Sequence, residues 1–200
     1  MSASLVGSEM CIRDRYYRAK GEIRPFRCIN RLDRDTSGAL ILAKNALSAA
    51  ILSAQMRNRE IRRTYLAVVC GVTPPSGTVS APVGRVSDSV IQRQVDPEHG
   101  ESAVTHYERL AVRNDHSLLE IHLETGRTHQ IRVHMAAQGH PVLGDPVYNG
   151  LRKGFPELAG QCLHARRLSF QHPRTGERMT LSSPLPAYFQ TVLTRCSRLV

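Results

Sequence analysis

Two aspartates that lie two residues apart, Asp33 and Asp35, are the residues of this 200-residue chain best suited to chemistry. Arginines flank Asp33 at Arg31 and Arg34, and the small residues 36–38 follow. A carboxylate beside cations stays ionised, as a nucleophile or a general base must. Turn chemistry can account for Asp35, because Asp, Thr and Ser in a turn bond to their own backbone. It does not account for the carboxylate of Asp33, which is therefore the candidate catalytic group.

The residues after this loop predict the elements that support it. The apolar run 39–43, bounded by turn residues, predicts a buried strand with the acidic loop at its mouth. Asn45 is a good N-cap for a helix through about Arg57, because apolar residues recur on one helical face. Residues 64–70 are β-branched and aromatic and predict another strand. The reactive carboxylate is thereby expected on a rigid support.

The rest of the chain predicts mostly strands. A short strand over 78–86 should lie near a sheet edge, because Pro82 lacks the N–H that a central ladder needs. The polar residues 87–101 predict an exposed loop, and a helix is predicted from about Thr128 to Gln138. Further elements are expected as strands near 102–111, 117–124, 162–170 and 178–181, and as a last helix over 186–197. The predicted fold class is α+β, with a mixed, mainly antiparallel sheet and a few packed helices.

The composition favours a soluble protein with a polyanionic partner. The chain carries 27 Lys and Arg against 17 Asp and Glu, a formal net charge of +10. Such an excess suits a nucleic acid, because each neutralised phosphate releases counterions. Hydrophobic residues make up 41% and charged residues 22%, and no apolar run approaches the roughly 18 residues of a membrane span. We therefore expect no membrane association.

The cysteines and histidines give no sign of a metal site. The five cysteines are scattered, odd in number and without a CxxC pair, which is typical of reduced thiols in a cytoplasmic protein. No cysteine and histidine spacing suggests zinc, and the stretch from His129 to His134 lacks the glutamate of HExxH. We expect no metal.

Three long motifs resemble the RluA-type RNA pseudouridine synthases. They are NRLDRDTSG at 30–38, ETGRTHQIRVHMAAQGHPVLGDPVY at 124–148 and LHARRLSFQHPRTGERMTLSSPLP at 163–186. The chain departs from the family at Asn30, where histidine is usual. The likeness covers roughly residues 16–190, and it implies the pseudouridine synthase fold, with the active cleft across the middle of the sheet.

The resemblance also implies roles for residues of the active site. Asp33 would be the catalytic aspartate, and Arg132 would pair with it. Tyr65 would stack on the target base, and Ile131 would form an apolar wall beside the uracil. Without the resemblance, Tyr65 is an ordinary core aromatic of a strand, Ile131 is ordinary helix core, and Arg132 is surface charge.

Further arginines are expected to contact RNA. In the family the arginine at the position of Arg31 contacts the RNA around a flipped nucleotide, and flipping is required because the reacting atoms are inaccessible in a stack. Arg127 and His129, near the start of the predicted helix 128–138, are assigned to RNA binding. The stretch 57–63 contains four arginines, and it is either a solvated helix end or an RNA-facing patch that includes Arg62 and Arg63.

The predicted activity is the isomerisation of uridine to pseudouridine within RNA. The N1–C1′ bond would break, the uracil would turn, and C5 would join C1′, so that no cofactor is needed. Whether Asp33 attacks C1′ or removes the C2′ proton stays open. Ribosomal RNA is the expected partner rather than tRNA or DNA, and the expected state is a cytoplasmic monomer. Two alternatives are a non-catalytic basic RNA-binding protein, inactive through truncation, and a glycoside hydrolase that uses Asp33 and Asp35.

The start of the chain does not fit this domain. Residues 1–15 lack the apolar core of a signal peptide and the pattern of a transit peptide. They are predicted to be a non-native or disordered leader before a catalytic domain at 16–200. The resemblance further implies that an N-terminal strand and any preceding RNA-binding domain are missing.

Overall fold

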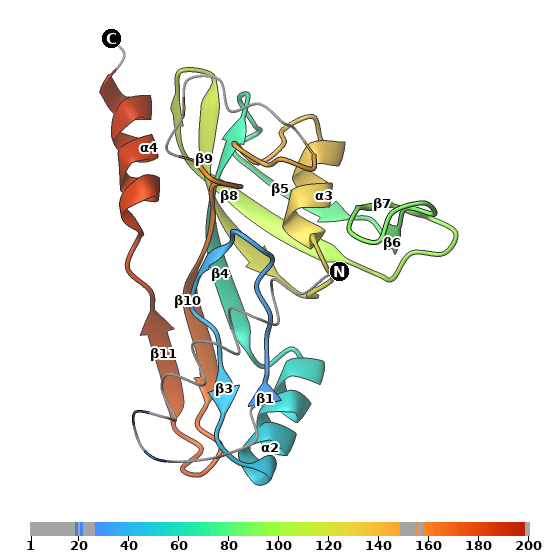
Figure 1. Ribbon diagram of the computed structural model, residues 1–200, viewed down its shortest axis with the longest axis vertical. Coiled ribbons are helices and arrows are strands. Elements are labelled where there is room, and N and C mark those ends of the chain that lie inside the picture. The colour runs from blue at the N-terminus through green and yellow to red at the C-terminus, as the bar shows by residue number, and fades with distance from the viewer. Residues whose placement is uncertain (1–18, 20, 22–26, 149–154, 156–157, 199–200) are drawn as a thin grey trace.

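The computed structural model describes residues 19, 21, 27–148, 155 and 158–198, with side chains up to residue 195. The predicted leader, residues 1–15, lies outside the described residues. A long twisted sheet runs through the molecule (Figure 1), with the strand order β11-β10-β4-β9-β8-β5 and with β2 beside β10. Its strands are β2 (Ser37–Gly38), β4 (Arg62–Cys70), β5 (Ser76–Ser80), β8 (Val104–Arg113), β9 (His116–Leu123), β10 (Leu163–Gln171) and β11 (Arg178–Ser182). All pairs are antiparallel except β2 with β10, so the predicted α+β class with a mixed, mainly antiparallel sheet is confirmed.

The central strand β4 buries both of its faces. Alternate residues of a strand point to opposite sides of the sheet. Ala67 and Val69 belong to the core beneath helix α3 (Gln130–Ala137), whereas Val68 packs in a second core with Phe189 of helix α4 (Ala187–Arg198). The sheet is therefore covered on both faces in its middle, which makes β4 a rigid element.

The predicted strand over 39–43 forms only at its end, as β3 (Leu42–Ala43), which is antiparallel to β1 (Arg27–Cys28). Residues 39–41 lie in no strand, and β2, just before them, is parallel to β10. Gly38 has a φ of 122° and lies against Ala165, whose carbonyl oxygen would lie 2.3 Å from an added Cβ. The chain leaves the large sheet there, and Leu42 is exposed.

The predictions for residues 78–101 also need correction. The predicted strand 78–86 is split, since β5 ends at Ser80 and β6 (Val83–Arg85) pairs with β7 (Arg93–Val95), which lies inside the predicted loop 87–101. Pro82 lies at the break, where it has no N–H for a ladder. The resulting hairpin projects beside α3 (Figure 1). The expectation of an edge position is confirmed for β5.

The helices follow their predicted positions with one shift. In helix α2 (Ala46–Arg57), the Asn45 side chain caps the first turn by accepting from Ser48 N at 2.8 Å, as predicted. Helix α3 begins two residues later than predicted, because His129 adopts a left-handed conformation with φ 59°. No helix among the described residues has the length and apolar character to cross a membrane.

Candidate active site

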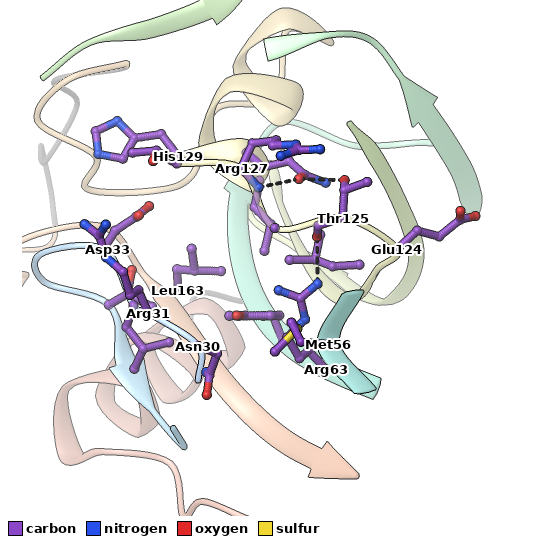
Figure 2. A pocket seen from close by; sticks show the side chains of 18 of the residues that line it. Asn30, Arg31, Asp33, Met56, Arg63, Glu124, Thr125, Arg127, His129 and Leu163 are labelled. Carbon is purple, nitrogen blue, oxygen red and sulfur yellow. Dashed lines mark hydrogen bonds between the residues drawn. The ribbon is translucent and has the colours of Figure 1, made fainter. Parts of the chain in front are cut away.

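A cavity of about 590 Å³ opens on one face of the sheet, between the loop before β2 and the start of α3 (Figure 2). Asp33 lines it from the loop, Tyr65 from β4, Ile131 from α3 and Leu163 from β10. The size is that of a pocket for a small molecule or a nucleoside. Four elements that are distant in sequence thus bring together the predicted aspartate, tyrosine and isoleucine.

The loop that carries Asp33 is fixed from behind. Thr36 N donates to Asp33 O at 3.0 Å, and the buried Gln161 donates through Nε2 to Thr36 Oγ1 at 2.9 Å. Ser37 Oγ lies 2.8 Å from His164 Nδ1 and 2.8 Å from the hydroxyl of Tyr188 on α4. These contacts hold the loop in one conformation, which a reacting carboxylate requires.

Asn30, at which the first motif departs from the family, also holds this loop. It is 6% exposed, and its Oδ1 accepts from Ile41 N at 2.8 Å. The asparagine thus ties the residues before Asp33 to those before β3. Its Nδ2 is buried and has no hydrogen-bond partner in the part of the chain that the structure describes.

Arg132 lies close to Asp33. Its side chain is 4% exposed, and Nη1 is 3.6 Å from Asp33 Oδ2, an ion pair beyond hydrogen-bond distance. Its direct hydrogen bonds run instead to Asp145, from Nε to Oδ2 at 2.6 Å and from Nη2 to Oδ1 at 2.8 Å. The geometry thus brings Arg132 and Asp33 together as expected, but with Asp145 as the nearer partner of the arginine.

Asp145 is the residue that the sequence-based reasoning missed. It is fully buried, and Oδ1 also accepts from Val147 N at 2.9 Å and from Tyr148 N at 3.2 Å. Burial lowers the pKa of Arg132, but the hydrogen bonds and charge of Asp145, followed by the charge of Asp33, more than offset this and raise it. Arg132 is therefore a fixed cation. The only sequence signal was that Asp145 falls within the motif at 124–148.

His129 and Tyr148 contact each other next to Arg132. The ring centre of Tyr148 is 5.1 Å from Cζ of Arg132, within the range of a cation–π contact. The hydroxyl of Tyr148 accepts from Arg93 N at 2.9 Å and lies 2.9 Å from His129 Nδ1. Burial raises the pKa of Tyr148 and lowers that of His129, so both are neutral at neutral pH. The phenol can then donate to the imidazole.

Tyr65 belongs both to the core and to the cavity wall. It is 6% exposed, packs in the core under α3 and lines the cavity. Burial raises the pKa of Tyr65, with the charge of Arg63 opposing this and that of Asp33 adding to it. The phenol therefore stays protonated at neutral pH and offers an apolar ring to the cavity.

The arginines assigned to RNA binding lie in different surroundings. Arg31 is exposed and lines the cavity. Arg127 lines it too, but its guanidinium contacts Glu101 and donates through Nε to Ser102 O at 3.1 Å. Arg62 is exposed and does not line the cavity, whereas Arg63 lines it and is buried. The arginines of the stretch 57–63 therefore do not form one patch, because Arg62 and Arg63 lie on opposite faces of β4.

Among the described residues, no group of three or more His, Cys, Asp or Glu could hold a metal ion.

Three buried histidines predict acid sensitivity. Burial lowers the pKa of His129, His134 and His164 below the value near 6.5 of the unfolded chain. Below about pH 6.5 the unfolded chain therefore takes up protons that the folded chain does not. The free energy of unfolding should fall by up to about 1.4 kcal/mol per pH unit for each histidine, and these groups contribute no such loss above about pH 7.

Urea unfolding at about pH 7.5 and about pH 5.5 measures this loss. His134→Asn should reduce the loss of unfolding free energy between the two pH values. His99→Asn should leave this loss unchanged, because the side chain of His99 is 82% exposed. Equal stability at the two pH values would contradict the prediction.

Comparisons with known proteins identify the family. The family model described as RNA pseudouridylate synthase matches residues 5–137, more than half of the chain. An uncharacterized RNA pseudouridine synthase of Bacillus subtilis (YjbO) is 45% identical over 172 residues, 86% of this chain and 59% of that protein. The ribosomal large subunit pseudouridine synthase D of Pseudomonas aeruginosa is 42% identical over 178 residues, 82% of this chain and 55% of that protein.

The fold has a solved counterpart in human RNA pseudouridylate synthase domain containing 4. It matches with a TM-score of 0.77 and 26% identity, covering 96% of this chain and 85% of that one. The chain spans less than two thirds of the length of the bacterial relatives named above. The resemblance to RluA-type synthases is confirmed, and the chain belongs to the RNA pseudouridylate synthase family.

Proposed function

We propose that the protein isomerises uridine to pseudouridine within ribosomal RNA. The observation that carries the proposal is the carboxylate of Asp33, which lines a cavity of about 590 Å³ with Nη1 of the buried Arg132 3.6 Å from its Oδ2. The choice of ribosomal RNA is supported by the relative named ribosomal large subunit pseudouridine synthase D, to which the chain is 42% identical.

Four residues of the site have a part in the proposed reaction. Arg132 places a positive charge 3.6 Å from Oδ2 of Asp33, and Asp33 either attacks C1′ or removes the C2′ proton. The N1–C1′ bond breaks and its electron pair leaves with N1. Tyr65 and Ile131 hold the flat, apolar faces of the uracil while it turns. C5 then bonds to C1′; this displaces Asp33 from C1′ in the first route, and in the second Asp33 returns the proton to C2′. C5 loses its proton and N1 gains one, so that no external oxidant, reductant or cofactor is consumed.

Arg31 and Arg127 are proposed to contact the RNA backbone around the flipped uridine. Both line the cavity, and arginine suits phosphate because its donors form a planar fork. His129 is proposed as a neutral polar contact. We further propose that the protein acts as a monomer in the cytoplasm, where scattered cysteines without a CxxC pair are typical.

The glycoside hydrolase alternative does not fit the site. Asp35 is exposed and does not line the cavity, so Asp33 and Asp35 do not face one bond from opposite sides. The family membership excludes it independently. The non-catalytic RNA-binding protein remains the second candidate, and a search for reaction products separates it from an isomerase.

The function is tested by incubating the purified chain with ribosomal RNA and with tRNA, each transcribed without modified bases, and by mapping pseudouridine in both. New pseudouridine in ribosomal RNA is the expected result. Pseudouridine in tRNA alone would refute the choice of RNA, and none in either would refute the activity. An Asp33→Asn sample serves as the control for contaminating enzymes.

A further inference from the structure

Arg63 is a buried cation that no carboxylate among the described residues pairs with. It is 9% exposed, and its only hydrogen bond in the described part of the chain runs from Nη2 to Thr125 O at 2.9 Å. Its Nε is buried without a hydrogen-bond partner. Burial lowers the pKa of Arg63, and the neighbour that most opposes this is the neutral phenol of Tyr65. A guanidinium in this state lacks a negatively charged partner.

The glutamate that lines the cavity together with Arg63 is already engaged. Glu124, which also lines the cavity, lies 2.7 Å from Arg59 Nη1 through Oε2 and 2.7 Å from His106 Nε2 through Oε1. Arg57 and Arg59 line the same cavity and add positive potential. Taking a charge out of water is costly unless an opposite charge pairs with it. The surroundings of Arg63 therefore favour an anion that the described residues do not supply.

The backbone leaves room for the guanidinium at the cavity wall. A Cβ on Gly126 would lie 2.4 Å from Nη1 of Arg63, so only glycine permits this approach. Arg63 lies two residues before Tyr65 on the same face of β4, roughly 6.6 Å along the strand. Figure 2 shows Asp33 and Arg63 on opposite sides of the cavity, with Leu163 between them. Arg63 is thus close to the base site but away from the reacting carboxylate.

We propose that Arg63 forms a second subsite, at the end of the cavity away from Asp33, that binds a phosphodiester group next to the target uridine. The proposal rests on the proposed function, because it takes the base of that uridine to lie on Tyr65. A phosphate supplies the full negative charge that Arg63 lacks, whereas a carbonyl of the uracil supplies only a dipole. Charge-assisted hydrogen bonds between arginine and phosphate are among the strongest in proteins.

The test compares two probes, uridine and uridine 3′,5′-bisphosphate, by NMR titration of the full chain. The wild type should bind the bisphosphate at least about tenfold more tightly than uridine. Arg63→Gln should weaken the bisphosphate about tenfold and leave uridine unchanged, and Arg63→Lys, which keeps the charge, should retain most of the preference. Arg62→Gln is the matched control: it removes the same charge from the same strand on the other face, and the preference should persist.

Several outcomes would overturn the subsite. If Arg63→Gln weakened the affinity for uridine and for the bisphosphate equally, Arg63 would contact the base. If the variant still preferred the bisphosphate as the wild type does, Arg63 would have only a structural role. A wild type that does not prefer the bisphosphate would also exclude it. Pseudouridine formation in ribosomal RNA is measured separately. A wild type that forms pseudouridine but does not prefer the bisphosphate would refute only the subsite. A wild type that prefers the bisphosphate but forms no pseudouridine would refute only the proposed function.

Discussion

Asp33→Asn is expected to reduce pseudouridine formation by at least about 10⁴-fold, because asparagine keeps the shape of the side chain but not the reactive oxygen. The loop itself should persist, since Thr36 N bonds to the backbone oxygen of residue 33 and not to the side chain. Affinity for RNA should stay within about threefold, because the arginines that line the cavity are unchanged. Single-turnover rates and filter binding measure the two quantities, and appreciable turnover by the variant would refute the role of Asp33.

Asp35→Asn is the matched control for this prediction. Asp35 is exposed and has a φ of 67°, a conformation that asparagine also tolerates. Its carboxylate forms an ion pair with the neighbouring Arg34, at 3.3 Å, and exposed pairs of this kind contribute little to stability. Turnover within about twofold of the wild type is expected. A large loss would instead show that any change in this loop disables the site.

Asp145→Asn is expected to lower both stability and turnover. The change leaves the buried guanidinium of Arg132 without its nearest counter-charge, and breaking a buried pair costs about 3–5 kcal/mol of unfolding free energy. The loss should fall at the lower end, because the amide oxygen can still accept from Val147 N. Turnover should fall about 100-fold, because Asp145 then no longer holds Arg132 in a fixed position relative to Asp33.

The positioning role of Asp145 can be separated from its structural role. Single-turnover rates are measured at a temperature at which the variant is fully folded, and the expected loss is in kcat rather than in KM. Arg132→Lys should show the same split, because an ammonium cannot form two parallel bonds with Asp145 while it faces Asp33. A folded Asp145→Asn variant with wild-type kcat would show that Asp33 does not depend on how Arg132 is held.

Some elements could be predicted because their signals are local. The cap at Asn45 and the β-branched run in β4 involve residues that are adjacent in sequence, and both were found. The extent of the strand over 39–43 could not be predicted, because an apolar pattern shows that residues are hydrophobic and not which strand they pair with. Gly38 approaches Ala165, far away in sequence, and the chain leaves the large sheet before it forms β3 at 42–43.

For the active site, too, some features could be predicted from the sequence and others could not. The sequence by itself determined that Asp33 is a carboxylate among cations in a family motif, that the chain is strongly basic, and that Tyr65 lies on a strand. Only the tertiary structure decided that Arg132 bonds to Asp145 and reaches Asp33 at 3.6 Å, and that Arg63 rather than Arg62 faces the cavity. Residue types and local periodicity are properties of short stretches, whereas the partner of a buried charge depends on which distant segments the packed sheet brings together.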